Sequence, residues 1–110
     1  MTALDAEIAK VARRAGRRLI DSDEANEFVR RQDGWALLQH DIPAVMVTSA
    51  YGDIAVLRRF FDTHYHRPSD DLGLAIELGG AAEDVQFHEE LVRWFADAKR
   101  FRPQAAAQPK

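Results

Sequence analysis

The segment Ala44-Val45-Met46-Val47-Thr48 decides the fold that the sequence predicts. It is short and apolar on both faces, a pattern typical of a strand that lies in a sheet between two layers of helices. Pro43 stands just before it and ends a short helical stretch at about residues 35–40. The segment therefore predicts an α/β fold whose sheet contains residues 44–48.

Helical periodicity flanks this strand on both sides. Apolar residues recur at spacings of three and four over residues 3–18, 53–62 and 77–100, which predicts three helices, the last of them long. The side chains expected to face the core are Leu4, Ile8, Val11, Ala15 and Leu19, then Ile54, Leu57, Phe60 and Phe61, then Leu78, Ala82, Val85, Leu91, Val92 and Phe95, with Trp94 at the edge. Residues 18–20 suggest a second, short edge strand. A sheet of two or three short strands is marginal alone, so we expect a fragment of a larger sandwich or a domain that pairs with another chain.

Composition sets further limits. A chain of 110 residues suits one domain, and its 46% apolar and 30% charged residues are ordinary for a globular protein. The net charge of −3 gives no bias toward nucleic acid or membranes, and no apolar run reaches membrane-spanning length. Without cysteine, a metal site would need His, Asp or Glu ligands. The Ala-, Gln- and Pro-rich residues 102–110 predict a disordered tail, which leaves residues 1–101 as the domain.

Four arginines crowd the end of the first predicted helix: Arg13, Arg14, Arg17 and Arg18. One interpretation is a solvated helix end, where cations interact favourably with the helix dipole. The other is a patch that binds phosphate, although no recognisable nucleic-acid motif accompanies it. Both interpretations stay open from the sequence.

The loop Tyr65-His66-Arg67-Pro68-Ser69-Asp70-Asp71-Leu72 is the stretch most suggestive of chemistry. It presents a histidine on a loop stiffened by proline, with carboxylates just behind it, an arrangement that can hold an imidazole toward a metal. His64 lies two residues earlier, but His-x-His pairs are common by chance. A second candidate, His88-Glu89-Glu90-Leu91-Val92, lacks the second histidine of the helical zinc motif H-E-x-x-H, so we reject it.

Two of these stretches together resemble a known family. Residues 31–46, beginning Arg31-Gln32-Asp33-Gly34-Trp35, are similar to a segment of the two-zinc aminopeptidases, and residues 65–72 are similar to that family's later motif, aromatic-His-x-x-x-Asp-Thr-Leu. The resemblance spans residues 4–101 and corresponds to the C-terminal third of the catalytic domain. It implies part of a three-layer α/β/α zinc exopeptidase sandwich with few short strands and a long C-terminal helix. Glutaminyl cyclase and the peptidase-like domain of the transferrin receptor share that fold.

The resemblance also implies roles for individual residues. His66 matches the last zinc ligand of the family, and Asp33 matches an acid that lines the active site. Asp70 matches an aspartate behind the ligand loop that orients the ligand, and Trp35 and Tyr65 match aromatic positions near the substrate pocket. In two departures from the pattern, Gln32 and Gly34 stand where serine and histidine are usual.

The zinc centre of that family implies ligands that this chain does not itself contain. In that family, two zinc ions are held by a His-x-Asp pair, a bridging Asp, a Glu-Glu pair and the last His. The zinc ions lower the pKa of a bridging water. The first glutamate of the Glu-Glu pair is the general base. All of these except the last His are expected upstream of residue 1. We therefore expect the C-terminal segment of a zinc aminopeptidase that removes N-terminal residues from peptides, inactive and weakly zinc-binding when isolated. Its partner would be the remainder of the peptidase domain or a second copy, and complete family members are often exported.

Two alternatives accompany this expectation. One is a non-catalytic interaction or dimerisation module of the same fold, and the other is an unrelated small α/β domain. If the family assignment holds, Asp33 and His66 should lie near one another at the C-terminal edge of the sheet, where open α/β folds bind ligands.

Overall fold

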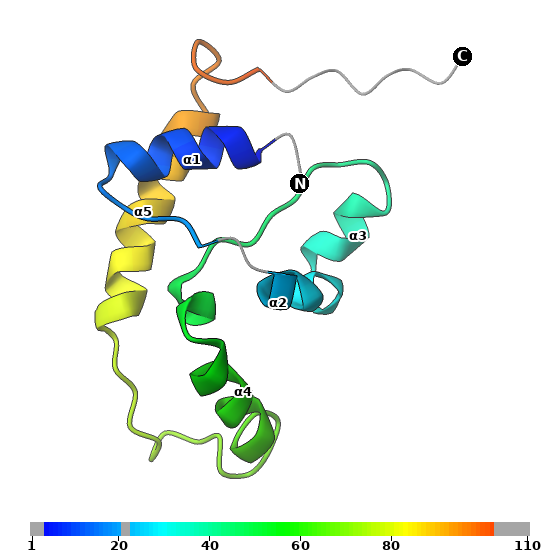
Figure 1. Ribbon diagram of the computed structural model, residues 1–110, viewed down its shortest axis with the longest axis vertical. Helices are drawn as coiled ribbons and strands as arrows, with labels where there is room; N and C mark the ends of the chain where they lie inside the picture. The colour runs from blue at the N-terminus through cyan, green and yellow to red at the C-terminus, as the bar shows by residue number, and fades with distance from the viewer. Residues whose placement is uncertain (1–3, 21–22, 103–110) are drawn as a thin grey trace.

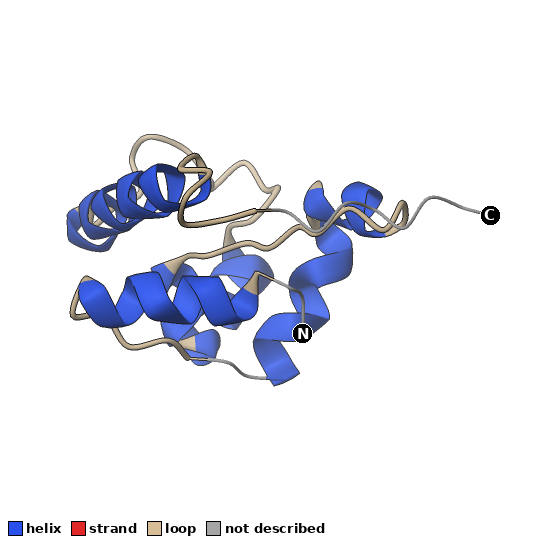
Figure 2. Cartoon of the chain, turned by 90° about the horizontal axis from the view of Figure 1, so that it is seen from above, coloured by secondary structure: helices blue, strands red, loops and turns tan. Residues whose placement is uncertain are grey.

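The computed structural model describes residues 4–20 and 23–102 as helices joined by loops (Figure 1). The α-helices are α1 (Asp5–Arg14), α2 (Asp23–Asn26), α3 (Gly34–Leu38), α4 (Ile54–Thr63) and α5 (Gly79–Phe95), and the 3-10 helices are η1 (Glu27–Arg31) and η2 (Ser49–Gly52). Figure 2 shows helix and loop but no strand in this described part of the chain. The predicted α/β fold is therefore wrong, and so is the predicted fragment of a three-layer sandwich.

The two predicted strands are the origin of this error. Residues 43–48 and 18–20 have neither helical nor strand structure, and no backbone hydrogen bond joins either segment to another described residue. A strand is stable only when its N–H and C=O groups pair with a neighbouring strand. The apolar pattern of residues 44–48 indicates a tendency to be buried. A strand would also need neighbouring strands to pair with, and there are none among the described residues.

The predicted helices are confirmed, with shifted ends. In α4 the carboxylate of Asp53 caps the N-terminus by accepting a hydrogen bond from the amide of Val56 at 3.1 Å. Helix α1 ends at Arg14, earlier than predicted, because Gly16 adopts a left-handed conformation with φ of 67°. The amide of Arg17 then bonds back to the carbonyl of Ala12 at 2.8 Å, which completes a Schellman motif.

The core lies where α1 packs against α5. Ile8, Val11 and Ala12 of α1 and Phe87, Leu91 and Trp94 of α5 are buried together, with Leu4, Val47, Phe95 and Phe101 packed around them. The indole Nε1 of Trp94 also donates a hydrogen bond to Glu7 at 2.9 Å. This pair of helices holds together the two ends of the described chain.

Two remaining expectations concern the membrane and the tail. Within residues 4–20 and 23–102, no helix combines the length and the apolar character that crossing a membrane requires. The tail predicted over residues 102–110 falls, except for Arg102, outside the described residues.

Candidate functional site

His66 lies in the loop that follows α4. The loop is a series of tight turns in which the amide of Arg67 bonds to the carbonyl of His64 at 2.9 Å and the amide of Asp70 to that of Arg67 at 3.0 Å. His66 has a φ of 58°, a left-handed conformation that is uncommon for a residue other than glycine. Its ring stacks on that of Tyr65, with centroids 3.9 Å apart and planes inclined by 20°. The turn and the stacked ring together hold the exposed imidazole in a defined orientation.

The two histidines of this loop differ in their partners. Nδ1 of His64 lies 3.2 Å from the hydroxyl of Ser69, which in turn donates to the carbonyl of Thr63 at 3.1 Å. His66 forms no hydrogen bond with any residue that the structure describes. The ring of His64 is therefore engaged within the loop, whereas both ring nitrogens of His66 are available to an external group.

Asp70 is exposed and lies four residues after His66. Its amide is bonded within the turn, but among the described residues its carboxylate forms no hydrogen bond, neither to His66 nor to another group. Its predicted role in orienting the metal ligand stays a prediction.

Asp33 and Trp35 lie on a different part of the molecule. Asp33 stands at the N-cap position of α3 without capping it through its side chain, and Trp35 is half-buried with the guanidinium of Arg30 5.5 Å from its ring centroid. Figure 1 shows α3 well separated from the loop after α4. The sheet edge that was expected to bring Asp33 and His66 together does not exist in the described chain.

An aromatic cluster connects the His66 loop with η1 instead. The ring of Tyr65 meets that of Phe61 at 4.8 Å, and Phe61 meets the buried Phe28 of η1 at 5.5 Å. Tyr51 of η2 stacks on the same Phe28 at 5.6 Å. Tyr65 is therefore a packing residue in this structure. Beside the cluster is a shallow cavity of about 200 Å³ lined by Phe28, Arg31, Arg58, Phe61 and Asp62.

The described residues do not form a metal site by themselves. Within residues 4–20 and 23–102 there is no group of three or more His, Asp or Glu side chains placed to hold an ion. A zinc ion needs three or four protein ligands in most sites, so this part of the chain does not supply a complete set.

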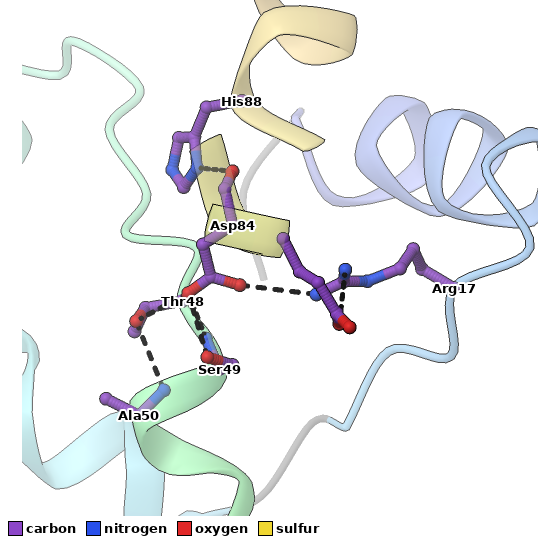
Figure 3. A network of polar contacts seen from close by, with 7 residues as sticks. Arg17, Thr48, Ser49, Ala50, Asp84 and His88 are labelled. Atoms are coloured by element: carbon purple, nitrogen blue, oxygen red, sulfur yellow. Dashed lines mark hydrogen bonds and ion pairs between the residues drawn. The ribbon is translucent and has the colours of Figure 1, made fainter. Parts of the chain in front are cut away.

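Asp84 of α5, which no motif predicted, forms several polar contacts with other parts of the described chain (Figure 3). Its Oδ2 accepts hydrogen bonds from the amide of Ser49 at 2.7 Å, from the Ser49 hydroxyl at 3.0 Å and from the Thr48 hydroxyl at 3.2 Å. Its Oδ1 forms an ion pair with Arg17 at 3.2 Å. Asp84 thus links the segment at Arg17 and the segment at Thr48 and Ser49 to the N-terminal part of α5.

These contacts determine the ionisation of Asp84. Burial is the largest single influence and raises the pKa, but the hydrogen bonds from Ser49 and Thr48 and the charge of Arg17 together hold the pKa of Asp84 below its ordinary value of 3.8. The carboxylate is therefore charged at neutral pH. A Ser-His-Asp relay does not arise here, because Nδ1 of His88 contacts the backbone carbonyl of Asp84 at 2.7 Å and not Ser49.

Comparison with known proteins adds no assignment: no family model, no curated protein and no solved structure matches this chain.

Proposed function

We propose that this chain acts as the C-terminal segment of a zinc-dependent aminopeptidase, in which His66 contributes one imidazole to the metal centre. The observation that supports this most directly is the state of His66, which is exposed, fixed by a left-handed turn and a stacked Tyr65 ring, and free of hydrogen bonds to described residues. Side chains held in an uncommon backbone conformation are concentrated at functional sites. The order of the two motifs, with Asp33 before His66, agrees with the family that the sequence resembles, whereas the separation of α3 from the His66 loop does not.

The chain's contribution to catalysis is correspondingly small. The described residues bring together no set of three ligands, so in this proposal the remaining ligands and the general base come from the remainder of the peptidase domain. The substrate in the complete protein would be the N-terminal end of a peptide. Of the other residues that the resemblance singles out, Asp70 keeps its implied orienting role in this proposal. Asp33 and Trp35 lie apart from His66, and Tyr65 packs on Phe61, so their implied roles are not part of it.

Zinc titration of the isolated chain by calorimetry is the first test. We expect weak binding that disappears in His66→Ala and persists in His64→Ala, since the ring of His64 is already engaged by Ser69. Equal zinc affinity in the wild-type chain and in His66→Ala would contradict the proposed role of His66.

The second test uses the continuous reading frame that contains this chain, assayed for release of 4-nitroaniline from aminoacyl-4-nitroanilides. Hydrolysis that requires His66 and tolerates His64→Ala would support the proposal. A reading frame without such hydrolysis, or hydrolysis that survives in His66→Ala, would overturn it.

A non-catalytic interaction module is the second candidate function. It is favoured by the number of large apolar side chains that the described chain exposes, among them Met46 at 50%, Val85 at 70% and Ile76 at 65% exposure. Apolar side chains left exposed in this number indicate a surface that another polypeptide covers.

A further inference from the structure

A surface cavity of about 320 Å³ lies at the C-terminal end of α1, away from the His66 loop. It is lined by Ala9, Ala12, Arg13, Arg17, Arg18 and Leu19. The cavity exists because the Schellman motif at Gly16 reverses the chain, so that residues 17–19 lie beside the last turns of α1. Three of the four arginines at this end of α1, namely Arg13, Arg17 and Arg18, therefore line the same cavity.

The four arginines are not equivalent. Arg17 is paired with Glu83 and Asp84, each at 3.2 Å, and Arg14 lies 4.6 Å from the centroid of the Trp94 ring. The side chains of Arg13 and Arg18 are exposed and form no ion pair or hydrogen bond with any described residue. Two unpaired cations therefore border the cavity in a chain whose net charge is −3.

The cavity wall between these cations is apolar. Ala9, Ala12 and Leu19 supply it, and Leu19 is 43% exposed although it is a large aliphatic residue. An arginine guanidinium matches the geometry of a carboxylate or phosphate and can bind it through paired hydrogen bonds. The carbonyl end of α1 would repel an anion, but the amides of Gly16 and Arg17 already bond the carbonyls of Arg13 and Ala12.

We propose that this cavity binds a small anion carried on an apolar body, such as an aryl or short alkyl phosphate or carboxylate. Arg13 and Arg18 bind the anionic head, and Leu19 with the two alanines receives the apolar body. Two free cations are too few for the multiple phosphate contacts on which nucleic-acid binding depends, so a small ligand fits better than a polyanion.

The first experiment titrates the complete wild-type chain with phenyl phosphate and follows backbone amide shifts by NMR. We expect saturable shifts centred on residues 9–19, and weaker binding of inorganic phosphate, which lacks the apolar body. Absence of saturable shifts, or shifts spread over arginines elsewhere in the chain, would overturn the proposal. This experiment uses only the wild-type chain, so it tests the proposed site even if a substitution in the later variants impairs folding.

Variants then test the two halves of the site. Arg13→Gln with Arg18→Gln should weaken phenyl phosphate binding by about tenfold or more, as expected when charged hydrogen bonds are lost. The matched control is Arg59→Gln with Arg67→Gln, which removes the same charge from two exposed arginines remote from the cavity and should leave the affinity unchanged. Leu19→Ser should abolish the preference for phenyl phosphate over inorganic phosphate. Equal losses in both double variants would show that only net charge matters and would contradict the site.

A last comparison separates two sources of the same ligand chemistry. Vesicles of phosphatidylcholine containing phosphatidic acid are sedimented with the wild-type chain and with the Arg13→Gln/Arg18→Gln variant. Co-sedimentation of the wild type alone would identify a lipid headgroup as the ligand. No co-sedimentation, together with binding of phenyl phosphate, would identify a free small anion. Equal co-sedimentation of both proteins would contradict a role for these arginines.

Discussion

Asp84 is the residue on which the contacts between distant segments depend most directly. Its carboxylate is 16% exposed and joins Thr48, Ser49 and Arg17 to α5. We expect Asp84→Asn to lower the free energy of unfolding by about 1–3 kcal/mol, because the amide loses charge-assisted hydrogen bonds and its NH₂ group faces donors. Urea unfolding at neutral pH measures this. Asp62→Asn is the control, since the exposed Asp62 carboxylate bonds to no described residue, and a loss of equal size there would contradict the assignment.

The pH dependence of stability provides a separate test of the same contacts. Because the folded-state pKa of Asp84 lies below 3.8, its stabilising contribution is fully present above that pH and is lost as the pH falls through the folded-state pKa. The stability difference between the wild-type chain and Asp84→Asn should thus be constant near neutral pH and should shrink as the pH falls below 3.8. A difference that grows on acidification would mean that the pKa of Asp84 is raised and not lowered.

Residue roles of this kind were only partly predictable. His66 was singled out as a candidate from its own loop, because a histidine on a loop with a proline and acidic residues is a local pattern; its role stays a prediction. Asp84 carries no such pattern; its partners are 35 and 67 residues away, and only the folded chain brings them into contact. A single acidic residue on a helix has the same appearance in the sequence whether it is solvated or bound.

Helix α5 shows how far periodicity predicts an element. Its existence follows from spacings within a few residues and was predicted correctly, but the helix was predicted to run to residue 100 and ends at Phe95. Its buried face was predicted less well, because the expected core included Val85 and Val92, which are 70% and 66% exposed, and placed the buried Trp94 at the edge. The face is fixed by the partner helix α1, and the positions of both helices depend on loops that carry no periodicity. The strands failed for a related reason, since a strand depends entirely on its neighbours.

Two adjacent residues of α5 therefore provide a direct test of which face of this helix packs against α1. Leu91 is 8% exposed and belongs to the core, whereas its neighbour Val92 is 66% exposed. We expect Leu91→Ala to reduce the free energy of unfolding by about 2–5 kcal/mol, because it removes buried methyl groups and leaves a cavity. Val92→Ala should change it by less than about 0.5 kcal/mol. Circular dichroism during thermal and urea unfolding measures both, and the reverse order would mean that α5 is rotated relative to α1.

At the scale of the whole molecule, the described chain exposes many large apolar side chains. Leu72 is fully exposed, and Leu78 and Ile76 are 66% and 65% exposed. The described core is small, consisting of the α1–α5 cluster and Phe28. An apolar content of 46% therefore predicted a larger core than the described chain forms, because composition counts apolar residues but does not say what covers them.

The exposed apolar side chains predict that the isolated chain associates with itself. Residues 43–48 present unpaired backbone groups together with Val45 and Met46, which are 46% and 50% exposed, so two copies can pair these segments as neighbouring strands. Sedimentation velocity should show a mass that rises with concentration. Val45→Lys with Met46→Lys should suppress this rise, because charged lysines disfavour pairing at a sheet edge. The matched control, Val56→Lys with Val92→Lys, adds the same charge at exposed helical positions and should leave association intact. A wild-type chain that stays monomeric at every concentration would show that residues 43–48 are stable without a neighbour.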